Sequence, residues 1–150
     1  MVTNSHPEEL DQGECLALLA TVSVGRVGIS SGALPAILPV NFILSGHDIL
    51  FRTVPGIKLH AALTGSVVAF EADQLGSATT ESWSVLVRGI AEEVTHPTQR
   101  AALERLVADS WAFDGDADHL VRVPATIISG QRIRPTPNKA HPGETTANGN

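Results

Sequence analysis

The segment FRTVPGIKL, which begins at Phe51, places two cations and a hydroxyl around a Pro-Gly pair. The pair predicts that a strand ends near Arg52 and that a helix opens at the glycine, since proline suits a first helical turn. A helix start presents unpaired N–H groups and a partial positive charge, so it binds anions. Arginine grips phosphate oxygens with a planar fork, and hydroxyl and ammonium groups add donors. Arg52, Thr53 and Lys58 therefore predict a phosphate site.

A second interpretation of the same segment needs no ligand. Arg52 can pair with a surface carboxylate such as Glu71 or Asp73, and Lys58 can point into water. The two carboxylates alternate along one predicted strand and so share a face. The segment also lacks the glycine-rich run ending in Gly-Lys-Ser/Thr of a P-loop. The residues alone leave both interpretations open.

The other reactive side chains form no recognisable catalytic or metal pattern. The histidines are His6, His47, His60, His96, His119 and His141. No pair of them has the i, i+4 spacing of a helical metal site, so we predict no metal. Cys15 is the only cysteine, which rules out an internal disulfide, and we expect it to be a buried structural thiol. No Ser-His-Asp or Cys-His arrangement can be assembled, so a catalytic residue stays unassigned.

Composition narrows the class of protein. A chain of 150 residues with 43% hydrophobic residues is expected to form one domain. The net charge of −6 argues against a general nucleic-acid surface, which needs a basic face. No apolar run approaches the roughly 20 residues of a membrane helix. The N-terminus has neither the basic nor the apolar region of a signal peptide. We expect a cytoplasmic protein that binds neither nucleic acid nor membrane.

The spacing of apolar residues predicts the elements that position the charged loop. We expect strands at 21–30, 34–44, 47–53, 66–73, 83–95 and 118–133, and helices at 7–19, 55–65 and 96–109. Pro35 and Pro39 should limit pairing of the second strand, and Pro124 should interrupt the last. Tight turns join the first three strands, which argues against a parallel sheet and favours a barrel. Residues 1–134 form the predicted domain, and 135–150 are a predicted disordered tail.

The chain as a whole resembles the pyridoxamine 5'-phosphate oxidase-like family, the flavin-binding split β-barrels. The matching pieces occur in the family's order, from about Glu8 to Ile133. They are CLALLATVSVGRVGIS, LPAILPVNFIL, ILFRTVPGIKL, VVAFEAD, WSVLVRGIAEEV and HLVRVPATIISGQRI. The resemblance implies a mainly β protein with short helices, namely a six-stranded antiparallel split β-barrel of the FMN-binding type. It also implies a homodimer with two FMN sites between the subunits.

The resemblance also implies which residues hold the cofactor. In such proteins the segment matching FRTVPGIKL holds the FMN phosphate, which selects Arg52, Thr53 and Lys58 again. The segment PVNF resembles the strand that lies along the isoalloxazine ring. Its candidates are Val40, Asn41 and Phe42, although Phe42 fits a plain core position equally well.

Further candidates come from the later strands. Ser82 and Trp83 open the strand that approaches the flavin, often from the partner subunit, with Ser84 as a weaker candidate. Trp83 also suits a dimer interface, where tryptophan is enriched. Trp111 and Phe113 match a segment that caps a ligand cleft, and core or interface packing explains them as well.

The implied activity is that of an FMN-dependent oxidoreductase, which exchanges two electrons or a hydride with a small molecule. A flavin carries the electron chemistry itself, so the lack of a catalytic residue is compatible with an enzyme. Pyridoxamine phosphate oxidation itself fits poorly, since the C-terminal stretch lacks that enzyme's dense basic and histidine motif. Two alternatives remain open, namely a reductase that uses a deazaflavin coenzyme and a non-catalytic flavin-binding or storage protein.

Overall fold

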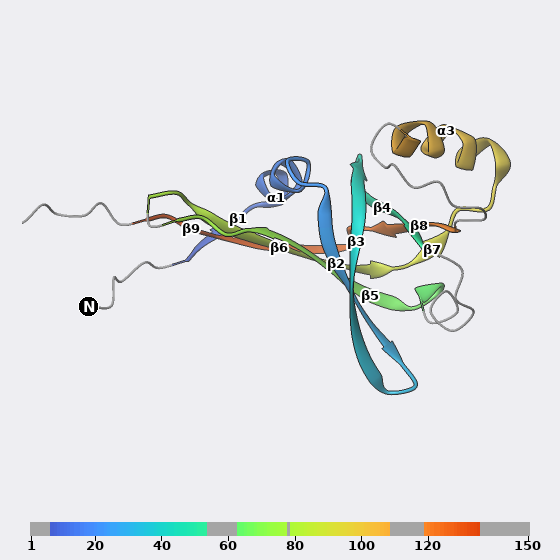
Figure 1. Ribbon diagram of the computed structural model, residues 1–150, viewed down its shortest axis with the longest axis horizontal. Helices are drawn as coiled ribbons and strands as arrows, with labels where there is room; N and C mark the ends of the chain where they lie inside the picture. The colour runs from blue at the N-terminus through green and yellow to red at the C-terminus, as the bar shows by residue number, and fades with distance from the viewer. Residues whose placement is uncertain (1–6, 54–62, 78, 109–118, 136–150) are drawn as a thin grey trace, which may run out of the picture.

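The computed structural model describes residues 7–53, 63–77, 79–108 and 119–135, which form a curled antiparallel sheet with two helices (Figure 1). The strand order is β1-β9-β6-β5-β2-β3-β4-β8-β7. The strands are β1 (Glu8–Leu10), β2 (Val24–Ser31), β3 (Leu34–Ser45), β4 (Asp48–Thr53), β5 (Val67–Gln74), β6 (Ser82–Ile90), β7 (Glu92–Glu93), β8 (His119–Pro124) and β9 (Ile127–Ile133). The helices are α1 (Gln12–Leu19) and α3 (Pro97–Ala108). The predicted class, mainly β with short helices, is confirmed.

The predicted meander of three strands is present as β2, β3 and β4. Gly32 and Ala33, at the first turn, both have positive φ angles, of 55° and 66°. This is the backbone twist that joins two right-twisted strands with a short loop. Pro35 and Pro39 both lie in the ladder between β3 and β2, and pairing of this half of β3 is limited as predicted, since the ladder with β4 begins only at Phe42. The first half of β3 has only this one neighbour, and such an edge accommodates residues without an N–H.

The sheet closes on itself because two long strands each change neighbours. β6 pairs with β9, whereas β7, directly after it, pairs with β8 at the other end of the strand order. The expected strand 83–95 is therefore divided at Ala91, and the last strand is divided after Pro124 as predicted. A Cβ at Gly89 would lie 2.1 Å from the Pro124 carbonyl oxygen, so the crossing requires glycine. The six predicted strands become nine because of these two divisions and β1.

The first helix begins later than predicted. Glu8 pairs with Arg132 in the ladder between β1 and β9, so the chain starts as a strand. Asp11 then caps α1, accepting from the Glu14 amide at 2.8 Å while Glu14 accepts from the Asp11 amide at 2.9 Å. This reciprocal capping box marks a stronger helix start than the residues upstream provide. Cys15 is fully buried, as expected.

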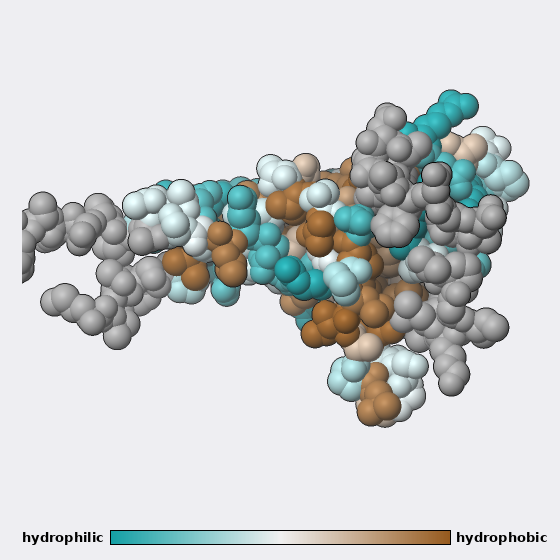
Figure 2. All heavy atoms as spheres, in the orientation of Figure 1, coloured by the Kyte–Doolittle hydropathy of each residue, from teal (hydrophilic) through white to brown (hydrophobic). Residues whose placement is uncertain are grey.

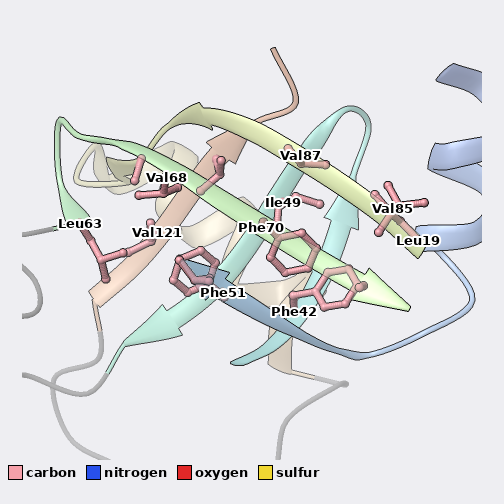
Figure 3. Close-up of a cluster of buried hydrophobic side chains, with 14 of the residues drawn as sticks. Leu19, Phe42, Ile49, Phe51, Leu63, Val68, Phe70, Val85, Val87 and Val121 are labelled. Atoms are coloured by element: carbon pink, nitrogen blue, oxygen red, sulfur yellow. The ribbon is translucent and has the colours of Figure 1, made fainter. Parts of the chain in front are cut away.

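The hydrophobic core fills the inside of the curled sheet (Figure 3). Phe42 and Phe70 meet there edge to face, with ring centroids 4.7 Å apart. A second, smaller cluster lies on the outer side, where Leu103 of α3 packs against Leu120 and its neighbours. The barrel thus has a filled interior and one outer face covered by a helix.

Several predictions fall partly or wholly outside the described residues. They concern most of the helix at 55–65, Lys58, Trp111, Phe113 and nearly all of the tail at 135–150. Gly65 has a φ of 76°, the left-handed conformation expected after a helix. No helix in the described ranges is long and apolar enough to cross a membrane.

Candidate functional site

Arg52 and Thr53 occupy the last two positions of β4, directly before the segment 54–62. Thr53 faces inward after Phe51 and is 7% exposed, whereas Arg52 is half-buried on the opposite face. The Thr53 hydroxyl oxygen is buried without a hydrogen-bond partner among the described residues. An unpaired buried polar group costs about 1–3 kcal/mol, and its presence calls for an explanation. A bound oxygen-rich group at the strand end would supply the missing partner.

Two more predicted residues lie beside this strand end. The ladder between β3 and β4 ends with Phe42 opposite Phe51. Asn41 and Val40 directly precede Phe42 on β3 and pair with Val24 and Gly25 of β2. Asn41 is exposed and Val40 is half-buried. We call this neighbourhood of β3, β4 and β8 the Thr53 end of the barrel.

Phe42 is a core residue. Its side chain is 1% exposed and packs against Phe70, and its amide donates to the Ser23 carbonyl at 2.9 Å. Of its two interpretations, the plain core position accounts for all of these contacts. A contact between Phe42 and a flavin stays a prediction.

Ser82 and Trp83 lie at the opposite end of the barrel, which we call the Trp83 end (Figure 1). Trp83 is 5% exposed, and the Ser82 hydroxyl accepts from the Gly76 amide at 2.8 Å. Figure 1 shows the start of β6 beside β9, at the end of the sheet away from β4. One protomer therefore does not bring Ser82 and Trp83 to Arg52 and Thr53.

A histidine that the sequence analysis gave no role lies at the Thr53 end. His119 is the ladder partner of Thr53, and its Nδ1 lies 2.5 Å from an Oε1 of Glu93. These residues come from three strands that are distant in sequence. Only the register of β4, β8 and β7 unites them, and we find no local pattern that signals it.

The carboxylates offered as alternative partners for Arg52 contact another arginine. Arg26 lies 3.1 Å from Glu71 and 3.4 Å from Asp73 on the outer face of the sheet. Burial raises the pKa of Glu71, and the negative charge of Asp73 adds to the rise. Arg26 and Asp73 also border a surface hollow of about 490 Å³ that includes Val24, the ladder partner of Asn41. The hollow adjoins the start of β6, since Asp73 is the ladder partner of Ser84.

The described residues contain no cluster of side chains that could hold a metal ion. No three His, Cys, Asp or Glu side chains gather there at distances suited to a metal ion. The polar groups at the Thr53 end are instead a hydroxyl, a guanidinium and an imidazole held by a carboxylate. This set suits an anion such as phosphate.

Comparisons with known proteins agree with the fold. Residues 11–132 match the family model described as pyridoxamine 5'-phosphate oxidase. The Mycobacterium tuberculosis protein Rv0080 is 39% identical over 130 residues, which cover 83% of this chain and 84% of that protein. The FAD binding protein from Mycobacterium smegmatis is 36% identical, with a TM-score of 0.75, covering 85% of this chain and 98% of that one. A Corynebacterium glutamicum protein is 31% identical, with a TM-score of 0.72, covering 91% and 99%. The chain therefore belongs to the pyridoxamine 5'-phosphate oxidase family.

Proposed function

We propose that this protein is a flavin-dependent oxidoreductase that exchanges two electrons or a hydride with a small molecule. The observation that carries the proposal is the buried, unpartnered hydroxyl of Thr53, next to Arg52 at the end of β4. A phosphate would give that hydroxyl an acceptor, and the Arg52 guanidinium would add donors for the same anion. The FAD binding by the Mycobacterium smegmatis relative, at 36% identity, supports a flavin as the molecule that carries the phosphate.

The residues present fit such a cofactor. Arg52, Thr53 and Lys58 would hold the phosphate, and the β3 backbone at Val40 and Asn41 would lie along the ring system. The bound flavin supplies the electron transfer, while the protein orients it and limits access of water. The buried face of β4 already excludes water from the Thr53 hydroxyl, so a phosphate there binds in a weakly screened environment.

The cofactor site is completed by a second copy of the chain in this proposal. Ser82 and Trp83 are too far from Thr53 within one protomer, so a partner must supply them if they contact the same flavin.

The outer face of the sheet also exposes apolar residues in register. Val67 pairs with Ile90, and Ile37 and Ile127 end a row across the strands whose inner members are Gly28, Ala69 and Arg88. Figure 2 shows hydrophobic side chains gathered around the β2–β3 hairpin and at its tip. Such a face suits burial against another copy.

The first experiment is an absorbance spectrum of the purified protein with and without added flavin. We expect bands near roughly 370 and 450 nm from a bound flavin. Thr53→Val, Arg52→Ala and Lys58→Ala should each weaken flavin binding. Arg105→Ala, on the exposed side of α3, is the matched control and should bind as the wild type does.

The identity of the cofactor follows from the released ligand. Denaturation followed by chromatography separates FMN, FAD and a deazaflavin, the three candidates. We expect FMN; recovery of FAD would place this chain with its Mycobacterium smegmatis relative. Binding of a deazaflavin alone would favour the reductase alternative. A bound flavin that no nicotinamide donor reduces would favour a storage or binding role.

The shared site can be tested by mixing variants. Thr53→Val and Trp83→Ala homodimers should each bind flavin poorly, because every site lacks one contributor. A heterodimer of the two has one site with both residues intact and one with neither. Recovery of half of the sites within the heterodimers is expected. No recovery, with heterodimers present by mass spectrometry, would place both residues in the same protomer's site or outside it.

A further inference from the structure

Arg88 is a cation in an apolar stretch of the outer face of the sheet. Its neighbour in β6, Val87, points into the interior cluster, as does Phe70, the ladder partner of Val87 (Figure 3). Because side chains alternate along a strand, Arg88 points outward, where it is exposed. The positions directly beside it on that face are all apolar, namely Leu86 and Ile90 along the strand and Ala69 and Ile127 across the ladders. Arg88 is thus surrounded by side chains that carry no charge.

The described part of the chain does not compensate this charge. Arg88 forms neither a hydrogen bond nor an ion pair with residues 7–53, 63–77, 79–108 or 119–135. The nearest carboxylate by register is that of Glu71, diagonally across the ladder, and Arg26 holds it at 3.1 Å. Two other outward arginines, Arg26 and Arg122, lie 3.1 Å and 2.7 Å from a carboxylate oxygen. Arg88 differs from them in having no such partner within the described ranges.

A surplus of negative charge lies on the same face as Arg88. Arg26 contacts both Glu71, at 3.1 Å, and Asp73, at 3.4 Å. One cation therefore serves two carboxylates, so this group of three, which we call the Asp73 cluster, carries one uncompensated negative charge. Its carboxylate side chains are 33% and 31% exposed, so another molecule can reach them. The outer face thus carries one surplus charge of each sign.

Exposed apolar side chains border both charges. They are Val24, Val67, Ile90 and Ile127, which are 49%, 71%, 51% and 53% exposed. A face with one surplus cation, one surplus anion and an apolar border is complementary to itself. In a dimer with two-fold symmetry, every contact between two different residues is made twice. The Arg88 of each protomer can therefore meet the Asp73 cluster of the other.

We propose that two copies of this chain pack outer face against outer face, with Arg88 of each protomer paired with the Asp73 cluster of the other. The inference rests on the dimer in the proposed function, and it names the surface and the charges that form that dimer. A second copy is the occupant because a nucleic acid or a charged peptide would match only one of the two signs. Arginine also suits an interface, where it is enriched and where it forms ion pairs.

The test reverses each charge separately and then combines the two reversals. Arg88→Glu places a carboxylate against the Asp73 cluster of the other protomer. Asp73→Lys makes the surplus charge of the cluster positive and leaves the contact between Arg26 and Glu71 in place. A heterodimer of the two variants has opposite charges at both pairs again. Arg105→Glu, on the exposed side of α3, is the matched control reversal.

Sedimentation equilibrium without added flavin measures the dissociation constant of the dimer. We expect each reversal to raise this constant about a hundredfold or more, because like charges then face each other at two places. Arg88→Gln should raise it about tenfold, and Arg105→Glu should leave it unchanged. In an equimolar mixture of Arg88→Glu and Asp73→Lys, native mass spectrometry should find more heterodimers than random pairing gives.

Unchanged dissociation constants for both reversals, or random pairing in the mixture, would overturn the proposal. A wild type that stays monomeric would also overturn it and would leave the face to a different partner. Denaturation midpoints check that the variants are folded, and Arg88→Gln tests the pair without introducing a repulsive charge.

The same variants separate this inference from the flavin function. Dimers that respond to the charge reversals as expected but bind no flavin would retain the interface and reject the flavin function. Dimers that bind flavin and are insensitive to both reversals would retain the function and reject the interface.

Discussion

The two ends of the barrel differ in how they satisfy their polar side chains. At the Trp83 end, Ser82 accepts a hydrogen bond from a backbone amide at 2.8 Å. Arg132 lies 3.4 Å from Glu81 and 3.7 Å from Glu14. Its buried Nε makes no hydrogen bond, but the two carboxylates compensate its charge. This end is organised within the protomer.

The Thr53 end keeps a buried hydroxyl without a partner among the described residues. Beside it, the Nδ1 of His119 lies 2.5 Å from a carboxylate oxygen of Glu93. Folding normally pairs buried polar groups, and unlike Arg132 this uncharged hydroxyl has no oppositely charged neighbour to compensate it, so it calls for an explanation. The comparison teaches that the two groups of predicted site residues differ in their surroundings: Trp83 is packed into the core, whereas Thr53 keeps a buried hydroxyl without a partner among the described residues.

The largest effect is expected for Trp83→Ala at the packed end. Truncation of a buried aromatic residue costs about 3–5 kcal/mol of unfolding free energy. Chemical denaturation should show this loss in the protein without added cofactor. Leu75→Ala, at a residue that is 83% exposed, is the control and should change stability by less than about 0.5 kcal/mol. If the Trp83→Ala protein were as stable as the control, the packing role assigned to Trp83 would be contradicted.

The next largest loss of stability is expected for Gly130→Ala, because the added methyl group overpacks the region near the Trp83 end. An added Cβ would lie 2.7 Å from the Cys15 sulfur and 3.2 Å from the Ser84 carbonyl oxygen. Forcing such contacts costs about 1–3 kcal/mol. Gly28→Ala is the matched control, because its nearest neighbour, the Ala69 Cβ, is at an ordinary 3.6 Å. Equal midpoints of denaturation for both variants would mean that β9 shifts freely and that this end is loosely packed.

In the protein without ligand, Thr53→Val should raise the free energy of unfolding, whereas the two preceding variants should lower it. Valine has nearly the same shape and removes an unsatisfied buried hydroxyl, so we expect a gain of about 1 kcal/mol. The same variant should lose affinity for FMN, as proposed above. Stability and affinity are measured on one preparation by denaturation and by fluorescence titration. A loss of stability in the absence of ligand would show that the hydroxyl serves the fold after all.

The smallest effect is expected for Glu71 of β5, the ladder partner of Leu86. Burial raises its pKa in the folded protein above that in the unfolded chain. The folded state therefore holds this proton more tightly, so the contribution to stability is present at low pH and lost as pH rises through the folded pKa. We expect the wild type to lose a few tenths of a kcal/mol relative to Glu71→Gln between about pH 4 and 7. Denaturation of both proteins across that range measures it, and parallel pH curves would contradict the assignment to Glu71.

Local patterns in the chain were enough for most of the fold. The alternating apolar residues and tight turns predicted β2, β3 and β4, because side-chain period and turn chemistry act over a few residues. The start of α1 was missed because Glu8 pairs with a strand, β9, that is distant in sequence. This pairing moves the helix start to the capping box of Asp11 and Glu14. The break at Ala91 was missed for the same kind of reason, since it depends on a crossing with Pro124.

The sequence by itself determined the family, the class of fold and the cluster of cations around Thr53. These rest on residue types and on spacings along a single segment. Only the tertiary structure decided that Arg26 holds Glu71, that Ser82 and Trp83 lie far from Thr53, and that His119 stands opposite it. Each of these depends on strand order and register, which are set by burial of the whole sheet rather than by neighbours in the chain.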